Sequence, residues 1–587
     1  MKKIIPAMLL VAVGVTFPAD ISGHLIETRW NQAAPYNKVC PVDRNGETTP
    51  PGCGAVAVGQ VLYHHRAPVK GFGSVDYDYK TIFAPGDTVV SNVKWNFEEH
   101  PFDFANILDS YKKGTYNDTQ ATAVSEYLFG IGAAMYMQYR KSGSSPKNDG
   151  SQLWGLHHNL HVSPDAMYHY RDYYSTEEWS AMLDSELSKG NPVYYGAGWY
   201  HYNTSGKLVR AGHFFIIDGK NDDGTYRINW GNNNNGDTVD LEIMNQNGNL
   251  PHIGGGAVCY HTRQCMITGL VPAAEGAVWP EQALISTRPL ILNDDKALEE
   301  VTLGKDRKFT IQYRVQHYSD RTYTNIHDGI GLYRDGESEP FTIIRNDSWR
   351  SGLGAGNYLD RRRVVTLDPS LPEGTYTARP MSENAVTGNW QLMLEGVKSS
   401  FDITVAANKS VTVRVPHNHG GPSSLFLREP MQEVANPYGA SNPGKVISMK
   451  IANTGLNNYE DSLRVTIRPD GAAKPVVLPY YVSVYQGCDL NLEYLIPSGM
   501  VDLEGRGYEI AVEYRDDYRG EYRTLGVGEE SGIDTTPATP VTTDTTLELH
   551  GLDGRMVYRG PAGDKPSLRP GIYIERVGEA VRKIIVR

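Results

Sequence analysis

The sequence predicts an α+β domain at its N-terminal end, followed by two all-β sandwich modules and a small β-rich segment at the C-terminus. Residues 20–272 mix helical and strand patterns, whereas the chain beyond residue 272 alternates apolar and polar residues between Gly, Asp and Asn turns. Sixty Gly, 37 Tyr and 34 Pro in 587 residues favour a turn-rich protein with much β-structure. At roughly 100–200 residues per domain, this length predicts about three to five domains.

Composition and charge limit the classes of function. Apolar residues make up 40% of the chain and charged residues 21%, which is ordinary for globular proteins and far from the disordered extreme. Lys and Arg number 56 against 68 Asp and Glu, which gives a net charge of −12, and no basic run stands out. Proteins that bind nucleic acid normally carry a basic patch. We therefore expect no nucleic-acid partner.

The cysteines and histidines lack the patterns of a disulfide scaffold or a metal site. None of the five cysteines forms a C-x-x-C pair, and none of the 17 histidines begins a His-Glu-x-x-His motif. We expect no metal and no cofactor. Cys259 and Cys265 either pair across a short gap or stay free, and both readings remain open. The histidine pairs 64–65 and 157–158 are expected at the surface.

The first 19 residues have the pattern of a signal peptide. Lys2-Lys3 form a positive start, an apolar stretch of 14 residues runs from Ile4 to Phe17, and Pro18-Ala19 precede polar sequence. The stretch is shorter than the ~20 apolar residues of a membrane-spanning helix, and no later segment is apolar enough to cross a membrane. A buried N-terminal helix is the alternative. The favoured interpretation predicts a protein that is secreted or held at the cell surface.

The α+β domain, residues 20–272, contains a cysteine at a predicted helix start. Pro50-Pro51-Gly52 break the chain just before Cys53, and apolar residues then recur at helical spacing until Pro68. The free N–H groups and dipole of a helix N-terminus favour a thiolate and lower the pKa of the thiol. The same N–H groups can receive a developing oxyanion. The alternative is a buried cysteine that acts as a small hydrophobe.

A histidine and an asparagine are predicted on one hairpin further along. His213 stands at the head of an apolar strand that ends near Gly219, and Asn229-Trp230 close the next strand. The turn Lys220–Gly224 joins the two strands into a hairpin. The segment Asp218–Gly224 resembles a calcium loop only superficially, because Lys220 occupies a ligand position. A thiol peptidase needs a thiolate, an imidazole that exchanges protons, and an amide that orients the ring. The segment supplies the last two groups.

Five ordered motifs of residues 20–272 resemble the streptopain family of papain-like cysteine peptidases. They are Trp30–Asn37, Gly52-Cys53 with its small-residue helix, Asn191–Tyr195, Gly212–Gly219 and Asn229–Gly231. The resemblance implies a papain-like fold for this domain and an activity as a cysteine endopeptidase on protein or peptide substrates. Family members carry a long pro-domain, whereas only a few residues separate Ala19 from Trp30. The enzyme is then either active once it has folded outside the cell, or covered at its cleft by a downstream module in the secreted form. The first is favoured, because the polar linker at 531–546 is long enough to hold the sorting domain away, and it predicts that residues 20–272 match the full chain in activity.

The resemblance also implies a role for each site residue. Cys53 is the nucleophile, His213 the proton shuttle and Asn229 the residue that orients the ring. Trp230 shields the pair formed by His213 and Asn229 from water. The side chain of Gln32 joins the backbone N–H of Cys53 in the oxyanion hole.

Residues 273–406 and 407–533 are predicted to form two immunoglobulin-like sandwich modules. Apolar residues occupy every second position in several runs, which marks half-buried strands, and many such runs are typical of β-sandwiches. The clearest runs are Phe309–Val315, Val411–Val415, Leu463–Ile467 and Ile510–Tyr514. An adhesin or a protein that binds host protein or polysaccharide, with a weak or inactive peptidase domain, is the alternative function.

Residues 534–587 are predicted to hold a linker and a small β-rich end. Thr, Pro and Asp dominate residues 531–546, as in an exposed linker. The segments 547–557, 568–578 and 581–587 resemble a type IX secretion sorting domain. That resemblance implies export from a bacterium of the Bacteroidetes type, with release from the outer surface or attachment to it through the secretion machinery.

Overall fold

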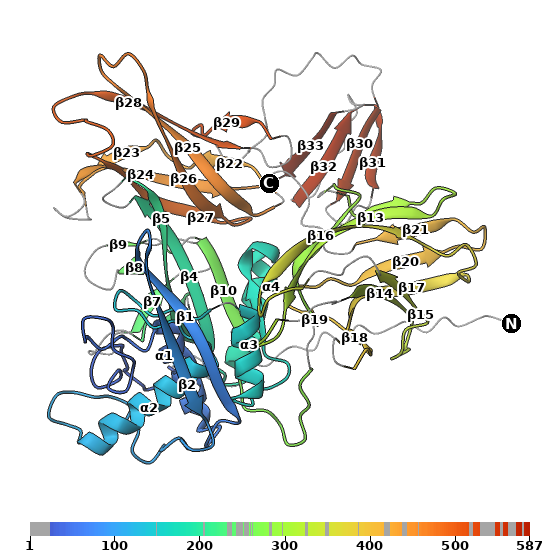
Figure 1. Ribbon diagram of the computed structural model, residues 1–587. Helices are drawn as coiled ribbons and strands as arrows, with labels where there is room; N and C mark the ends of the chain where they lie inside the picture. The colour runs from blue at the N-terminus through green and yellow to red at the C-terminus, as the bar shows by residue number, and fades with distance from the viewer. Residues whose placement is uncertain are drawn as a thin grey trace. The chain divides into compact units, whose positions relative to one another are not determined.

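The computed structural model describes residues 24–528 and 546–586, apart from short internal gaps (Figure 1). The gaps are residues 148, 203–205, 223, 232–237, 242–249, 252–256, 259, 261, 281–283, 296–297, 323–326, 347–351, 385–386, 416–422, 437–442, 456, 516–519, 552–555, 562–570 and 578–579. The expected signal peptide and all but the last residue of the expected linker lie outside the described residues. The chain divides into two compact units, one that ends at Leu525 and one that runs from Gly526 to Arg587.

The part of the chain before residue 272 mixes helices with one main sheet. Its helices are α1 (Cys53–His65), α2 (Asp118–Ala134), α3 (Asp149–His158), the 3-10 turn η1 (Arg171–Tyr173) and α4 (Thr176–Ser188). Its strands are β1 (Ser74–Ala84), β2 (Asp87–Asn96), β3 (Met167–Tyr170), β4 (Val193–Tyr202), β5 (Leu208–Lys220), β6 (Tyr226–Asn229), β7 (Thr238–Leu241), β8 (Leu250–Pro251), β9 (Ala257–Val258) and β10 (Thr262–Thr268). No helix in the described part of the chain is long and apolar enough to span a membrane.

The main sheet has the strand order β3-β10-β4-β5-β6-β7 and separates two cores. Side chains alternate between its faces, so Tyr194 and Ile216 join the core around α1 and α2, whereas Tyr195 and Phe215 join the core around α4. The hairpin β1–β2 forms a separate sheet that lies beside α1 and α2 (Figure 1). Each of the two helices α2 and α4 begins with a capping box, in which the side chain of Asn117 or Ser175 accepts a hydrogen bond from the third helical residue.

The next part forms a first sandwich of two sheets. One sheet has the order β16-β13-β11-β19, and the other has the order β12-β21-β20-β17-β14-β15 with β18 on β17. Apolar residues of both sheets, such as Phe309 and Ile403, share one core. The strands are β11 (Leu284–Leu292), β12 (Glu300–Thr302), β13 (Lys308–His317), β14 (Asp328–Arg334), β15 (Thr342–Asn346), β16 (Tyr358–Thr366), β17 (Gly374–Glu383), β18 (Trp390–Leu392), β19 (Leu394–Glu395), β20 (Phe401–Val405) and β21 (Val411–Arg414).

A second sandwich follows, and its sheets have the orders β22-β24-β23, with β27 on β24, and β26-β25-β28-β29. The strands are β22 (Leu425–Leu427), β23 (Gln432–Val434), β24 (Gly444–Asn453), β25 (Tyr459–Pro469), β26 (Val476–Val484), β27 (Asp489–Pro497), β28 (Tyr508–Arg515) and β29 (Tyr522–Thr524). The alternating runs around Ile311, Val413, Val465 and Val512 are all strands, so the period-2 prediction is confirmed at these positions.

The unit that begins at Gly526 contains one small antiparallel sheet. Its strands β30 (Thr546–Gly551), β31 (Met556–Pro561), β32 (Gly571–Val577) and β33 (Ala580–Val586) have the order β31-β30-β32-β33. The described residues of this unit are thus largely strand, as the C-terminal sequence predicts.

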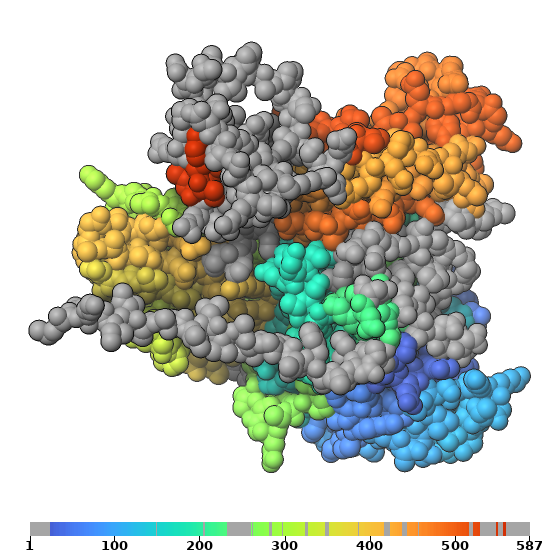
Figure 2. Space-filling view, turned by 180° about the vertical axis from the view of Figure 1, so that it is seen from behind, coloured from blue at the N-terminus to red at the C-terminus, as the bar shows by residue number. Residues whose placement is uncertain are grey.

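Both sandwiches contact the α/β part of the same compact unit. Ile285 and Tyr318 of the first sandwich lie in the core around α1 and α2. The hydroxyl of Tyr318 lies 2.6 Å from Nδ1 of His157, which is fully buried. The expected surface position of His157 is therefore wrong, because the first sandwich covers α3. On the second sandwich, Thr176 of α4 donates to the backbone oxygen of Gln486, and teal atoms around α4 lie against orange atoms of this sandwich (Figure 2).

A polar cavity of about 460 Å³ lies where the three parts meet. Its wall includes Asp172 from η1, Arg288 from β11, and Glu460 and Tyr481 from the second sandwich. Burial raises the pKa of Asp172 well above its usual value, and the neighbouring Glu460 carboxylate raises it further. The pair therefore holds a proton in the folded protein at a pH where an unfolded chain would have lost it.

The replacement Asp172→Asn is expected to flatten the pH dependence of stability. The raised pKa means that the folded state binds more protons than the unfolded state, so stability falls as the pH rises from about 4 through the folded pKa. Asparagine carries no charge to repel Glu460. The variant should therefore show a higher melting temperature than the unchanged protein at pH 8 and a similar one at pH 4.5. The exposed Asp335→Asn is the control, and equal melting curves at pH 8 would refute the prediction.

Candidate active site

Cys53 is the first residue of α1, as the sequence predicts. Gly52 caps the helix with φ at 95°. A Cβ at position 52 would lie 2.9 Å from Sδ of Met137 and 3.0 Å from the backbone oxygen of Ser144. Both the dihedral angle and the space therefore require glycine before the cysteine. Cys53 itself is half-buried and carries a free thiol.

Two effects oppose each other at the Cys53 thiol. Burial raises its pKa, whereas the backbone N–H groups of Phe214, Gly54 and Cys53 itself lower it. Burial is the larger effect, so the net shift of the pKa is upward. The lowered pKa expected from the helix N-terminus alone is wrong, because that expectation left out the loss of water around the sulfur.

His213 lies in β5 and is only 6% exposed. Its Nε2 is 2.8 Å from the backbone oxygen of Trp230. Because a carbonyl only accepts hydrogen bonds, Nε2 carries the proton of the neutral ring and Nδ1 is the acceptor. Burial lowers the pKa of His213 to about 4, and the Trp230 carbonyl opposes this shift in part. The imidazole is therefore neutral at pH 7.

The residue after His213 connects its strand to the helix of Cys53. The backbone N–H of Phe214 donates to Sγ of Cys53 over 3.5 Å. Hydrogen bonds to sulfur are long and weak, but this one fixes where the start of α1 meets β5. The contact thus brings the start of α1 next to the strand of His213, although Cys53 and His213 lie 160 residues apart in the chain.

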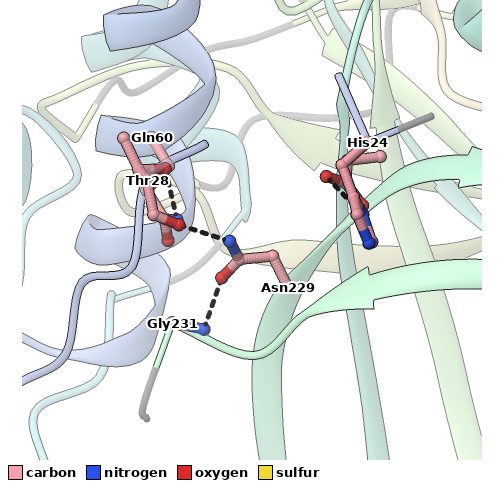
Figure 3. Close-up of polar contacts among 6 residues, drawn as sticks. His24, Thr28, Gln60, Asn229 and Gly231 are labelled. Carbon is pink, nitrogen blue, oxygen red and sulfur yellow. Dashed lines mark hydrogen bonds and ion pairs between the residues drawn. The ribbon is translucent and has the colours of Figure 1, made fainter. Parts of the chain in front are cut away.

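Asn229 makes a different contact from the one expected. Its Nδ2 donates to the backbone oxygen of Thr28 over 2.7 Å, and its Oδ1 accepts from the N–H of Gly231 over 3.0 Å (Figure 3). Both ends of the amide are therefore engaged away from His213. The hydrogen-bond partner of the His213 ring is the backbone of Trp230, the residue next to Asn229.

Thr28 and Gln60 extend this contact to α1, and neither residue was predicted from the sequence. Nε2 of Gln60 donates to Oγ1 of Thr28 over 2.8 Å (Figure 3). Gln60 is fully buried in the helix that begins at Cys53. The end of β6 is thereby linked through Thr28 to the helix of the nucleophile. A single polar residue among the apolar positions of this helix was the available signal for Gln60, whereas nothing local marks Thr28.

Trp230 packs around the histidine. The Trp230 side chain is 6% exposed, and its ring centroid lies 6.0 Å from that of His213 at an interplanar angle of 29°. Phe215 and Tyr260 complete the aromatic group, with centroids 4.8 Å and 5.6 Å from Trp230. This group excludes water from one side of the imidazole.

Gln32 lies in the loop that follows Trp30 and is half-buried. Trp30 anchors the loop, since it is fully buried and its Nε1 donates to the backbone oxygen of Leu108 over 2.9 Å. Asn31 turns the chain by accepting from the N–H of Ala33. The amide of Gln32 makes no hydrogen bond within the described residues, so the structure does not join it to Cys53.

Among the described residues, no group of three or more His, Cys, Asp or Glu side chains is placed to bind a metal ion. Cys265 is a buried free thiol, and its neighbour Cys259 lies outside the described residues. Lys220, the last residue of β5, pairs with Tyr226, the first residue of β6. The predicted hairpin is therefore confirmed.

The replacement Asn229→Ala is expected to lower stability by about 1–3 kcal/mol, because the buried N–H of Gly231 loses its partner and the Thr28 oxygen loses one of two donors. Thermal unfolding of the full chain measures the loss. Asn92→Ala, which removes an amide from an exposed strand pair, is the matched control. A melting temperature within error of that control would contradict the role of Asn229 as a buried link.

Comparisons with known proteins agree with the motifs. The sequence profile of the Peptidase C10 family matches residues 30–238. Streptopain of Streptococcus pyogenes is 29% identical over 264 residues, which cover 41% of this chain and 60% of that protein. A thiol protease/hemagglutinin of Porphyromonas gingivalis, PrtT, is 28% identical over 250 residues, which cover 42% of this chain and 26% of that protein.

A solved structure gives a further match. The active wild-type interpain A cysteine protease of Prevotella intermedia is 32% identical, and the match covers 42% of this chain and 94% of that chain with a TM-score of 0.36. The chain spans about 60% of the length of the streptopain that it matches. From the profile match and the sequence identities together, the chain belongs to the streptopain family, the C10 family of cysteine peptidases.

Proposed function

We propose that this chain is a secreted cysteine endopeptidase that hydrolyses peptide bonds of proteins through a thioester at Cys53. The observation that carries the proposal is the contact between the N–H of Phe214 and Sγ of Cys53, which places a partly accessible thiol beside the strand of His213. A nucleophilic cysteine at a helix start, with a histidine on the neighbouring strand, is the arrangement that thiol peptidases use.

The neutral imidazole sets the direction of the proton transfers. Nε2 of His213 donates to Trp230, so Nδ1 takes the proton from the Cys53 thiol. The thiolate sulfur then bonds to the substrate carbonyl carbon, and the carbon–nitrogen bond breaks as Nδ1 returns its proton to the leaving amine. Water adds to the thioester and gives a proton to Nδ1. The carbon–sulfur bond breaks, and that proton restores the thiol.

Negative charge on the substrate oxygen needs hydrogen-bond donors. The first N–H groups of α1 have no partner within the helix and point toward its N-terminal end. We assign the Cys53 N–H to this oxyanion hole, with the Gln32 amide moving in when substrate binds. Trp230 keeps water from the imidazole, and Asn229 holds the Trp230 backbone through its bonds to Thr28 and Gly231.

Labelling of the intact protein tests the proposal. An irreversible thiol-directed peptidase inhibitor is expected to stop hydrolysis of denatured casein and to add one adduct per chain. Peptide mass spectrometry should place that adduct at Cys53. Cys40, Cys265 and Cys488 serve as internal controls because all three thiols are buried. Hydrolysis that survives full labelling of Cys53 would overturn the assignment.

We also propose that residues 1–19 direct export, that the two sandwiches are immunoglobulin-like, and that residues 547–587 are a sorting domain for surface delivery. The support is the sequence pattern of each segment together with the four-stranded sheet β31-β30-β32-β33. Deletion of residues 547–587 in the native host is expected to retain the protein inside the cell. Equal amounts of the two forms in the culture medium would refute the sorting role.

A further inference from the structure

The hairpin that carries His213 extends beyond the sheet to which it belongs. β4 and β5 pair from Val193 opposite Ile217 to Tyr202 opposite Leu208. Their outer neighbours stop earlier: β10 pairs with β4 no further than Gly198, and β6 pairs with β5 no further than Ile216. The outer end of the hairpin therefore has no flanking strand among the described residues. A two-stranded ribbon alone is only marginally stable in water.

The second sandwich holds this outer end. Tyr202 is 7% exposed and belongs to the apolar core of the sandwich, and Tyr200 and Leu208 pack against the same core. The hydroxyl of Tyr480 donates to the backbone oxygen of Tyr200 over 2.7 Å. In the opposite direction, the hydroxyl of Tyr202 donates to the backbone oxygen of Pro479. The hairpin and the second sandwich thus each donate one tyrosine hydrogen bond to a backbone oxygen of the other.

Two further contacts fix the same end. The rings of Tyr200 and Tyr481 lie with centroids 4.9 Å apart. Gly206, in the turn of the hairpin, lies so close to the second sandwich that a Cβ there would be 3.4 Å from Met500. We call Pro479, Tyr480 and Tyr481 of β26 the hairpin clamp.

A pair of glycines lies between the hairpin clamp and His213. Gly198 pairs directly with Gly212, the residue before His213, and Ala197 pairs with His213 itself. Glycine in a strand loses more conformational freedom on folding and weakens the strand. The clamp holds Tyr200, which pairs with Arg210 of β5. His213 lies three residues after Arg210 on the same strand, which is about 10 Å along the strand at 3.3–3.4 Å per residue. A twist at the glycine pair would displace the imidazole.

We propose that the hairpin clamp positions His213 for catalysis, with Tyr480 and Tyr202 as positioning residues. The clamp fixes the outer end of a hairpin whose middle is weakened by two glycines, so the imidazole stays aligned with the thiol. The proposal rests on the proposed function, in which His213 moves the proton. Peptidase activity would then depend on a sandwich that contributes no group to the reacting atoms.

The test uses the full-length double variant Tyr202→Phe/Tyr480→Phe, which keeps both rings and removes both hydroxyls. Its matched control is Tyr376→Phe, which removes a hydroxyl that donates to the backbone oxygen of Pro372 over 3.0 Å in the core of the first sandwich. Misplacement of a catalytic group by even about 1 Å can cost up to about 10²-fold in rate. We expect kcat on a peptide substrate to fall about tenfold in the double variant, with KM changed less than about twofold and the control unchanged.

The pH dependence of Cys53 alkylation by iodoacetamide gives a readout independent of hydrolysis. A less confined imidazole gains water, so its pKa rises and the ring stays doubly protonated up to a higher pH, where it cannot take the proton of the thiol. The acidic midpoint of the alkylation profile should move upward in the double variant and not in Tyr376→Phe. Thermal unfolding of all three proteins shows whether the folded fraction is equal under assay conditions.

The outcomes separate the two proposals. An unchanged alkylation midpoint together with kcat equal to that of the control overturns the clamp and leaves the peptidase proposal standing. Absence of hydrolysis by the unchanged protein overturns the proposed function, and the alkylation midpoint then decides the clamp by itself. A fall in kcat that only follows the loss of folded protein also counts against the clamp.

Discussion

Replacement of Cys53 by alanine is expected to lower the hydrolysis of an unfolded protein substrate by at least about 10⁴-fold, because the thioester path needs the sulfur. What remains is the rate that substrate binding and the oxyanion donors provide without a nucleophile. The fold should survive, since the side chain is half-buried and its hydrogen bond to Phe214, on a distant segment, is long and weak. Release of fluorescent peptides from labelled casein measures the rate.

Cys40→Ala is the matched control for this replacement. Cys40 is a free thiol that is buried, and burial raises the pKa of Cys40 to about 12. It lies in the core around α1 and α2, and it is not part of the proposed site. Unchanged activity in Cys40→Ala together with loss in Cys53→Ala assigns the reaction to one sulfur. Full hydrolysis by Cys53→Ala would contradict the peptidase mechanism proposed here.

Local signals in the sequence predicted the elements that carry the site. The break at Gly52 and the spacing of apolar residues placed the start of α1 at Cys53. The polar turn between two apolar runs predicted the antiparallel pair β5 and β6. Both features depend on residues close in the chain, where turn chemistry and periodicity act directly.

The contacts between distant segments could not be predicted in this way. The amide of Asn229 bonds to Thr28, 201 residues earlier, rather than to the nearby histidine. The orientation of His213 by a backbone oxygen also leaves no trace in the sequence, because every residue has a carbonyl. Residue type suggested Asn229 for that task, and only the three-dimensional arrangement shows which acceptor lies within reach.

The same limit applies to the burial of residues by later parts of the chain. His157 reads as half of a polar surface pair, yet Tyr318 of the first sandwich covers it. Arg171 is 1% exposed, because Tyr485 of the second sandwich stacks on its guanidinium, with Cζ 4.1 Å from the ring centroid. The spacing of apolar residues in an element indicates which side chains are buried within its own part of the chain. It says little about which side chains a segment hundreds of residues away will cover.

A fragment of residues 20–272 is therefore expected to lose most of its folded population, although the motifs alone predict that it acts independently. The fragment lacks Ile285 and Tyr318, which lie in the core around α1 and α2. Loss of a large buried side chain typically costs about 2–5 kcal/mol, so the loss of two removes about 4–10 kcal/mol, a large part of the 5–15 kcal/mol by which a protein is usually stable. Tyr202 would also lose the apolar core that covers it.

A fragment of residues 20–528 is the matched comparison, because it keeps both sandwiches and ends just after the first compact unit. We expect it to unfold cooperatively and to equal the full chain in activity per active site, with sites titrated by an irreversible thiol inhibitor. The shorter fragment should show little near-ultraviolet circular dichroism and few titratable sites. Cooperative unfolding and full activity of 20–272 would mean that its cores pack stably without the sandwiches. The dependence of the peptidase part on the sandwiches would then be refuted.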